Sequence, residues 1–380
     1  MGIKTEGFRL RRAIFPALYY GANAVYQGYI SLYYTGLGFR SGQLGVISAL
    51  TALAALAVQP IWGRMADRAK SQRRLLGILC VLAAAMLLPA VRGQSFLWQL
   101  VWAMGFYAFF CALLPLGDAI LLSGGEGFGA YRLAGGLSYA LAGALFGVVL
   151  NRLGGRGILW TAAGLFGLAG LSAKLLPRTA GHARRASVLG LLKDARLRTL
   201  LLFVLPLQMT MACFYTFHAP HFKSLGGTDG MLGLGYLLAA ASEAPYLLLS
   251  ERIYRRFGAA KPMCAAAILM ALRWLVLGIA DSPWVVLFTQ LLHGGGFIVV
   301  TVSMAYWING HVPPEQRAGG QALLNMFTFG LARILGNLLA GLLAQHLGEG
   351  AAFLASAGVC VAAPVVFALK TAGRADDLGC

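Results

Sequence analysis

Among the ionisable side chains inside or at the edges of long runs of apolar residues, six are candidates for chemistry that moves protons or binds anions. They are the acids Asp118 and Glu243, the histidine His293, and the arginines Arg132, Arg273 and Arg333. A charge surrounded by hydrocarbon is costly, so each of these groups needs a partner or a water-filled cavity. Carboxyl and imidazole groups can bind and release protons, and arginine can bind an anionic group. The sequence therefore predicts a polar site for protons or small anionic molecules inside an apolar body.

Two pairs of these residues are expected at similar depths. Asp118 and Arg132 flank one short connection, which predicts a salt bridge that is either a gate or a static staple of a helix hairpin. Asp118 is also a candidate proton-coupling group. Glu243 is the main candidate for carrying a proton, since a carboxyl whose proton affinity depends on its surroundings can couple proton binding to a conformational change. Arg273 lies at a depth similar to that of Glu243 and could pair with it, either in gating or as an anchor.

His293 and Arg333 complete the set. An imidazole in mid-span suits a proton relay, although a histidine satisfied by a neighbouring helix is the alternative. Arg333 has no carboxylate on its own predicted helix, so we expect it to face the interior and bind an anionic substrate group or Glu243.

Polar and aromatic residues recur at three- and four-residue intervals in three of the apolar runs. The candidate substrate-binding residues among them are Tyr19, Asn23, Tyr26, Gln27, Gln208, Tyr215, His218 and Asn325. An unpaired amide in hydrocarbon is strongly unfavourable, so these stripes belong on inward faces. They are expected either to line a cavity or to form hydrogen bonds between helices.

The composition indicates the class of protein to which these residues belong. Of the 380 residues, 59% are hydrophobic and 12% are charged, whereas an ordinary soluble domain has about 25% charged residues. A soluble enzyme, a disordered chain and a disulfide scaffold are all poor interpretations. The sequence has no Walker A loop, no paired His/Cys metal cluster and no nucleophile elbow, so we expect no enzyme activity, no cofactor and no metal site.

The apolar runs predict the fold class, because about 20 apolar residues are needed for a helix to cross a membrane. We predict an all-α membrane protein with twelve transmembrane helices in two pseudo-symmetric six-helix bundles. The predicted spans are residues 13–36, 41–63, 75–92, 96–122, 129–150, 157–177, 199–222, 231–250, 262–280, 283–309, 319–345 and 351–370.

The positive charges predict the orientation. Lys and Arg number 31 against 13 Asp and Glu, a net charge of +18. Most of the cations fall in alternate connections, which predicts that those connections and both termini are cytoplasmic. Because topology accounts for the basic charge, we expect no nucleic-acid partner. The expected setting is a multi-pass monomer in the lipid bilayer of the cell membrane.

An internal repeat is predicted from similar inner turns. The basic segment from Gly63 to Arg74 has a counterpart 187 residues later, from Ser250 to Lys261. The predicted domains are 1–177, a cytoplasmic linker at 178–198, and 199–380. The end of this linker is amphipathic, which suits either a helix on the membrane surface or a simple tether.

The segment containing Gly63, Asp67 and Arg68 resembles the loop signature of the major facilitator superfamily. More narrowly, the chain is similar to the branch of lactose permease-like, phenylpropionate permease-like and nucleoside–proton symporters. The residues that carry this resemblance are Pro115-Leu-Gly-Asp118-Ala, Glu243-Ala-Pro245, Arg273-Trp274 and Gln290-Leu-Leu-His293-Gly294.

The resemblance implies a gate at the Gly63 segment. Gly63 would allow close helix approach, and Asp67 and Arg68 would hold a cytoplasmic contact that is released as the two halves rock. The alternative is a positive-inside loop with one incidental aspartate.

The predicted function is proton-coupled symport, by alternating access, of a small polar or weakly acidic organic solute such as an aromatic acid, a sugar or a nucleoside. The alternatives are a proton-driven efflux antiporter for drugs or sugars, and a non-transporting membrane sensor or enzyme on a transporter-like body.

Overall fold

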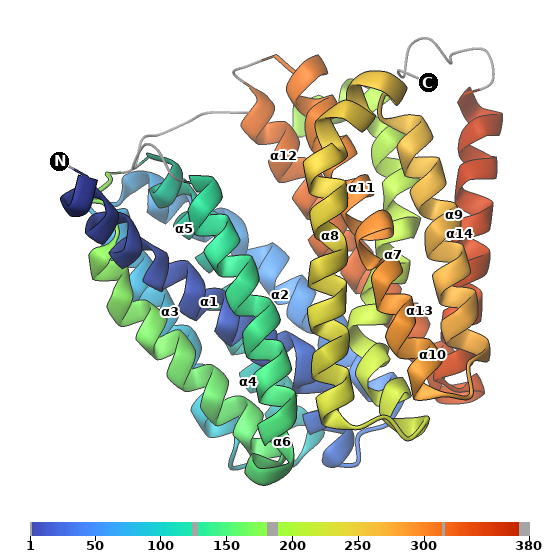
Figure 1. Cartoon of the computed structure of the whole chain (residues 1–380), viewed down its shortest axis with the longest axis horizontal. Helices are drawn as coiled ribbons and strands as arrows, with labels where there is room; N and C mark the ends of the chain where they lie inside the picture. Colours follow the sequence, from blue (N-terminus) through green and yellow to red (C-terminus); the bar gives the residue numbers. More distant parts are fainter. Residues whose placement is uncertain (1, 124–127, 181–188, 314–315, 372–380) are drawn as a thin grey trace. The chain divides into compact units, whose positions relative to one another are not determined.

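The computed structural model describes residues 2–123, 128–180, 189–313 and 316–371, and all regular elements in these ranges are helical (Figure 1). The first six α-helices are α1 (Gly2–Gly36), α2 (Ser41–Arg68), α3 (Gln72–Ala90), α4 (Phe96–Phe110), α5 (Leu113–Ser123) and α6 (Phe128–Ser172). The others are α7 (Ala195–Ser224), α8 (Asp229–Phe257), α9 (Ala260–Ile279), α10 (Pro283–Phe288), α11 (His293–His311), α12 (Arg317–Asn325), α13 (Ala332–Leu347) and α14 (Glu349–Thr371). The predicted all-α class is confirmed.

Within the described ranges, ten helical stretches are long and apolar enough to cross a membrane. The predicted span 129–150 lies within α6, which has 45 residues, and the predicted span 157–177 begins in α6 and ends beyond its last residue. A straight helix of that length would measure roughly 68 Å, about twice the hydrocarbon thickness. Gly154 interrupts α6 with φ 65° and ψ 175°, and the chain turns back there (Figure 1). Helix α6 therefore consists of two membrane-length arms. Helix α1 is not among the ten stretches that meet the length and apolarity criteria. The count of twelve transmembrane helices stays a prediction.

Three spans contain irregular turns. Helices α4 and α5 are separated at residues 111–112, because Pro115 has no N–H to donate to the carbonyl four residues earlier. A 3₁₀ turn at Thr289–Leu292 separates α10 from α11. A π-helical segment at Met326–Leu331 joins α12 to α13. Such departures from α-helical geometry often occur at functional positions.

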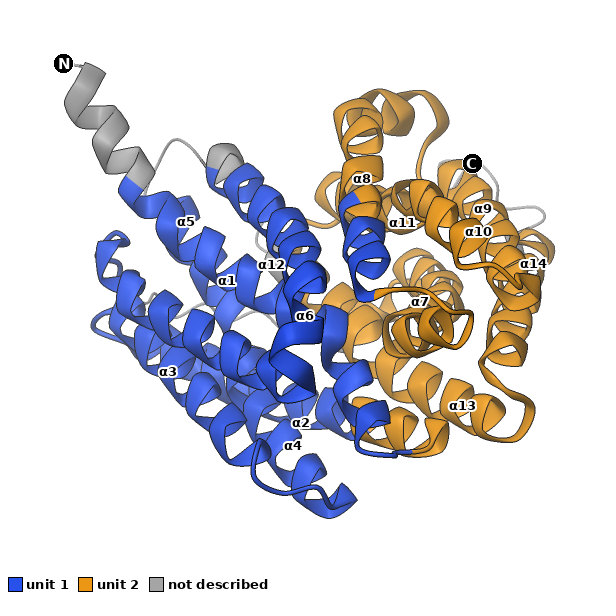
Figure 2. Ribbon diagram, turned by 60° about the horizontal axis from the view of Figure 1, so that its bottom comes forward, with its two compact units in different colours: residues 1–39, 50–184, 229–237 blue, residues 40–49, 185–228, 238–380 orange. Residues whose placement is uncertain are grey.

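Two compact units divide the chain (Figure 2). Unit 1 comprises residues 1–39, 50–184 and 229–237, and unit 2 comprises residues 40–49, 185–228 and 238–380. The first turns of α2 thus belong to unit 2, and the first turns of α8 to unit 1. The predicted domain boundaries remain a prediction, and residues 181–188 of the proposed linker lie outside the described ranges.

Unit 1 is built around α1, which packs along α6, and around α3, which packs against α6 and α4. Aromatic side chains fill its interior: the rings of Tyr26 and Phe106 are 4.4 Å apart, and those of Phe106 and Phe166 are 5.5 Å apart. The start of α8 joins this unit, where Tyr236 donates a hydrogen bond to the Gly28 carbonyl at 2.5 Å.

Unit 2 packs α9 against α14 and α11, and α7 against α13 and α14. The Trp274 side chain is completely buried and donates through Nε1 to Thr210 Oγ1 at 3.0 Å. The start of α2 joins this unit at a crossing with α13. A Cβ on Gly45 would lie 2.5 Å from the Asn337 carbonyl oxygen and 2.8 Å from the Gly341 Cα. Because both are backbone atoms, only glycine fits.

This crossing yields a stability prediction with a matched control on the same helix. Gly45→Ala should unfold more easily than Gly63→Ala by about 1–3 kcal/mol, the usual penalty for overpacking a close-packed interior. Apart from its chain neighbours and the backbone of its own helix, no described atom lies within 4 Å of a Cβ on Gly63. Both variants gain helix propensity, but only Gly45→Ala introduces a clash. The measurement is thermal unfolding of the purified proteins in detergent. Equal melting temperatures for the two variants would contradict the close approach of α2 to α13 at Gly45.

Candidate functional site

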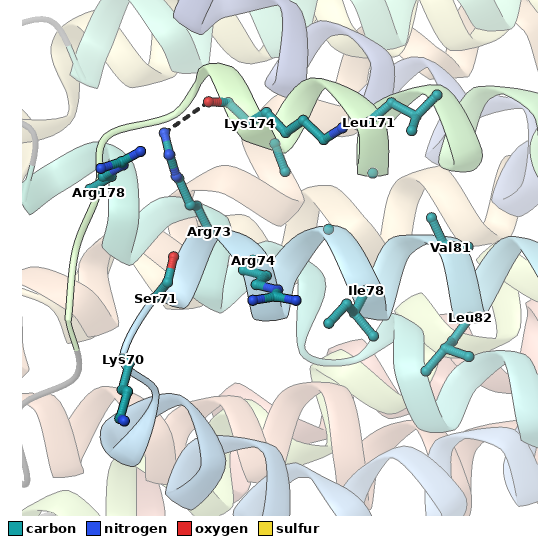
Figure 3. A pocket seen from close by; sticks show the side chains of 13 residues that line it. Lys70, Ser71, Arg73, Arg74, Ile78, Val81, Leu82, Leu171, Lys174 and Arg178 are labelled. Atoms are coloured by element: carbon teal, nitrogen blue, oxygen red, sulfur yellow. Dashed lines mark hydrogen bonds between the residues drawn. The ribbon is translucent and has the colours of Figure 1, made fainter.

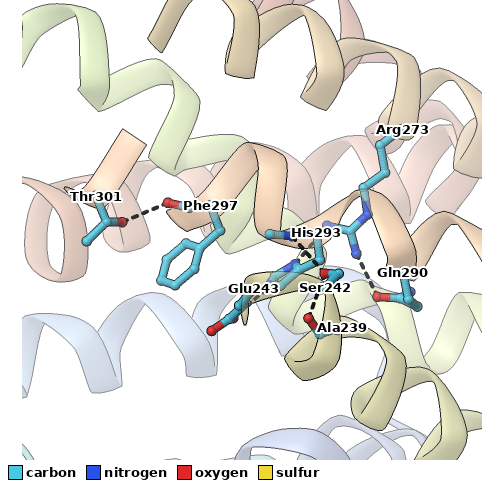
Figure 4. Close-up of polar contacts among 9 residues, drawn as sticks. Ala239, Ser242, Glu243, Arg273, Gln290, His293, Phe297 and Thr301 are labelled. Carbon is cyan, nitrogen blue, oxygen red and sulfur yellow. Dashed lines mark hydrogen bonds and ion pairs between the residues drawn. The ribbon is translucent and has the colours of Figure 1, made fainter. Parts of the chain in front are cut away.

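A chain of five polar side chains runs through the interior of unit 2, and Figure 4 shows all of them except His218. In order along the chain of contacts, they are Glu243 on α8, His293 on α11, Arg273 on α9, Gln290 in the 3₁₀ turn and His218 on α7. Glu243 Oε1 lies 3.5 Å from His293 Nε2, and His293 Nδ1 lies 2.9 Å from Arg273 Nη1. Arg273 Nη2 lies 2.7 Å from Gln290 Oε1, and Gln290 Nε2 lies 3.2 Å from His218 Nε2.

Arg273 fixes the direction of every hydrogen bond in this chain, because a guanidinium has donors and no acceptor. His293 Nδ1 must therefore accept, which places the proton of the neutral imidazole on Nε2, facing Glu243. On the other side, Gln290 accepts through Oε1 and donates through its amide nitrogen to His218 Nε2. A second proton on His293 would occupy Nδ1, and the resulting N–H would face an N–H of Arg273 with no acceptor between them.

Burial separates the two ends of the chain. Arg273, Gln290, His293 and His218 are between 1% and 5% exposed, whereas the Glu243 side chain is 28% exposed. Arg273 also lies over the rings of Phe214 and Trp274, 4.2 and 4.9 Å from their centroids. Such contacts stabilise a cation removed from water. Glu243 is thus the accessible end of an otherwise buried network.

The predicted direct pairing of Glu243 with Arg273 is wrong, because the imidazole of His293 lies between the two side chains (Figure 4). The expectation rested on similar depth along two helices, which does not specify what stands between them. The arrangement found replaces an ion pair with a hydrogen-bonded relay from Glu243 to Arg273.

A close crossing of α8 and α11 places Glu243 beside His293. The Gly294 N–H donates to Ser242 Oγ at 2.9 Å, and a Cβ on Gly294 would lie 2.8 Å from the Glu243 Cα. Only a residue without a side chain allows this approach. Since Ser242 precedes Glu243 and His293 precedes Gly294, one backbone contact sets the position of both titratable groups.

Arg333 is the second residue of α13, which follows the π-helical segment, and it is half-buried in unit 2. Its guanidinium lies 5.3 Å from the Tyr215 ring centroid and 5.6 Å from that of Phe329. Among the residues that the structure describes, none forms an ion pair or hydrogen bond with it. The Tyr215 ring is also 6.4 Å from the His293 ring, edge to face. One aromatic side chain therefore contacts both Arg333 and the relay.

In unit 1, Asp118 and Arg132 form the predicted salt bridge, with Oδ2 and Nη1 3.0 Å apart. Arg132 also donates to the hydroxyl of Tyr20. The side chains of Arg132 and Asp118 are 46% and 27% exposed. An ion pair with this much water access contributes little to stability. Its geometry is confirmed, and its proposed gating and proton-coupling roles stay predictions.

The predicted substrate-binding stripes occupy several different environments. Tyr19 and Tyr26 are buried in the aromatic interior of unit 1, and Gln208 is buried in unit 2, whereas Asn325 is exposed. Gln27 accepts a hydrogen bond from the Tyr107 hydroxyl at 2.9 Å. The buried Oδ1 of the neighbouring Asn23 has no partner among the described residues. Gln27 and Asn23 therefore form the polar part of the α1 stripe.

The segment from Gly63 to Arg68 lies at the end of α2. Gly63 and Arg68 are exposed, and the Asp67 side chain forms no hydrogen bond or ion pair with a described residue. The expected close helix approach at Gly63 is wrong for the described chain, since nothing lies within 4 Å of its Cβ position. The gating role of this segment stays a prediction.

Two residues that complete the relay had no role assigned from the sequence. Gln290 connects Arg273 to His218, and Ser242 binds the backbone at Gly294. The available signal was the run Gly294-Gly295-Gly296 directly after His293. Such a run in an apolar helix indicates close approach by a neighbour.

The membrane-length helices, the embedded relay and the isolated arginine are features of a membrane transporter. A model of the MFS_1 like family, within the major facilitator superfamily, matches residues 10–355, and the chain belongs to this family. It is accordingly an integral, multi-pass membrane protein and a transporter rather than an enzyme.

Individual relatives agree with this assignment. The chain is 28% identical over 387 residues to the maltose permease of Geobacillus stearothermophilus, covering 98% of each sequence. It is 27% identical over 367 residues to a probable 3-phenylpropionic acid transporter of Escherichia coli strain K12, covering 92% of this chain and 94% of that one. A crystal structure of the nucleoside transporter NupG superposes with a TM-score of 0.84 at 18% identity, covering 95% and 98% of the two chains.

Proposed function

We propose that the protein is a proton-coupled symporter for a small polar or weakly acidic organic solute, with Glu243 as the proton carrier. The relay in unit 2 is the observation that carries this proposal. Glu243 alone in the relay has substantial access to water, and its neighbour His293 presents an N–H toward it. The guanidinium of Arg273 stays protonated, so proton exchange is confined to the Glu243 end of the relay.

Protonation of Glu243 offers a physical route to coupling. The ionised carboxylate attracts the Nε2–H of His293 across 3.5 Å, and the neutral acid attracts it less. Proton binding therefore weakens a polar link between α8 and α11. A ligand shifts a conformational equilibrium only by its differential affinity for the two states, and this link provides such a difference for the proton.

Arg333 is the proposed substrate-binding cation. It is held between aromatic rings without an ionic partner among the described residues, so its donors are available to a carboxylate or hydroxyl. Tyr215 contacts both Arg333 and His293, which places substrate binding next to the proton relay. The names of the relatives suggest the compounds to test: maltose, 3-phenylpropionate and nucleosides.

The Asp118–Arg132 pair and the segment from Gly63 to Arg68 are the proposed gate elements. Both contain exposed cations near helix ends, where ionic contacts can form and break in water at low cost. In this proposal transport proceeds by alternating access, with both termini in the cytoplasm.

Removing the charge of Glu243 tests the proton role. Purified protein in liposomes should take up one of maltose, 3-phenylpropionate or uridine faster when the outside is made acidic. Glu243→Gln should abolish this response to the pH gradient while retaining exchange of the same solute across the membrane, because only proton release is lost. The measurement is uptake of radiolabelled solute with and without an imposed gradient.

Glu251→Gln is the matched control, since Glu251 lies on the same helix but is exposed and, within the described part of the chain, forms an ion pair with Arg255 alone, at 2.6 Å. It should keep the wild-type response. A Glu243→Gln protein that still responds to the gradient would refute the assignment of the proton carrier.

Removing the guanidinium of Arg333 tests the substrate role. Arg333→Ala should weaken binding of the transported solute roughly 10- to 150-fold, the range expected for loss of one charge-assisted hydrogen bond. Arg333→Lys should fall between this variant and the wild type, because lysine keeps the charge but loses the planar fork. Binding is measured by calorimetry on the purified proteins, with the exposed Arg252→Ala as control. Wild-type affinity in Arg333→Ala would exclude the role.

A further inference from the structure

A second, strongly basic site lies in unit 1, at the junction of α3 with the end of α6 (Figure 3). It is a cavity of about 740 Å³ with five cationic side chains and no carboxylate among its lining residues. The five cations are Lys70, Arg73, Arg74, Lys174 and Arg178. None of them belongs to the relay around Glu243, which lies wholly in unit 2.

Arg73 has a structural task that the other four cations do not share. Its Nη1 donates to the carbonyl oxygens of Lys174 and Leu176 at 2.9 and 3.0 Å, which ties the start of α3 to the turn that follows α6. The side chains of the other four, Lys70, Arg74, Lys174 and Arg178, are exposed and form no hydrogen bond or ion pair with a described residue. Four uncompensated charges therefore share one cavity, where an anion would relieve their mutual repulsion.

The wall of the cavity is apolar. Ile78, Val81 and Leu171 line it, and they are 50%, 46% and 59% exposed. At its floor α3 and α6 cross closely: a Cβ on Gly77 would lie 2.9 Å from the Gly170 carbonyl oxygen. The cations thus stand at one end of a groove whose remaining length follows two membrane-spanning helices.

We propose that this groove binds an anionic phospholipid, with its phosphate among Lys70, Arg74 and Lys174 and an acyl chain along Ile78, Val81 and Leu171. Cationic side chains complement the phosphodiester, and exposed aliphatic side chains complement the hydrocarbon. Basic pockets between transmembrane helices bind acidic head groups in this way. A free phosphate would use only the cations, and a zwitterionic lipid would bring a positive group into a cluster that is already positive.

The test is native mass spectrometry of the full chain in detergent, titrated with phosphatidylglycerol and, separately, with phosphatidylcholine. Phosphatidylglycerol should bind at least tenfold more tightly than phosphatidylcholine. Arg74→Gln combined with Lys174→Gln should weaken phosphatidylglycerol binding about 30-fold, from the usual contribution of a cation near an acidic membrane surface. The control removes two exposed charges in unit 2, Arg252→Gln with Lys261→Gln, and should change binding less than twofold.

Thermal unfolding in the presence of each lipid provides a second measurement of binding that does not depend on mass spectrometry. Phosphatidylglycerol should raise the melting temperature of the wild type and of the control, but not of the Arg74/Lys174 variant. Equal binding of the two lipids, or unchanged binding in the double variant, would overturn the proposal. Displacement of the lipid by an equal concentration of inorganic phosphate would show a site for free anions instead.

Discussion

The buried guanidinium of Arg273 is the constraint on which the polar interior of unit 2 depends. It is 2% exposed, and no carboxylate of the described residues is in direct contact with it; instead it donates to His293 and Gln290 and lies over Phe214 and Trp274. Burying an unpaired charge is strongly unfavourable unless its hydrogen-bonding capacity is met. The α7, α9 and α11 helices must therefore keep these groups in place, and the tautomers of the two histidines follow.

The irregular helix segments provide the room that this network needs. The 3₁₀ turn at Thr289–Leu292 brings Gln290 and His293 to the same guanidinium, and the glycine after His293 admits α8. The π-helical segment before Arg333 stands in a comparable position on the next span. These local departures from α-helical geometry place the candidate proton and substrate groups around one ring, that of Tyr215.

The all-helical membrane class was predictable from the sequence, because the length of each apolar run is read along the chain, whereas the orientation predicted from positive charge stays a prediction. The Asp118–Arg132 salt bridge was predictable for a similar reason, since both residues flank one short connection. Side-chain contacts between different helices were harder to predict. Similar depth suggested that Glu243 meets Arg273, but the rotation of each helix about its axis decides the contact, and His293 lies between them.

The same limit applies to the polar stripes. Periodicity showed that Tyr19 and Tyr26 face inward, but it did not distinguish a cavity from the aromatic interior in which both are buried. Gly63 and Gly45 lie on the same helix and have the same side chain, yet only Gly45 is at a close crossing. A sequence supplies the residue, whereas its partner depends on packing that involves distant segments.

The protonation of His293 is the most direct measure of this account. Nitrogen-15 magnetic resonance on histidine-labelled protein, with the signal assigned by its loss in His293→Gln, reports which ring nitrogen carries the proton. The account predicts a neutral imidazole at neutral pH, protonated on Nε2 and unprotonated on Nδ1. A proton on Nδ1 would contradict it, because the donors of Arg273 would then have no acceptor there.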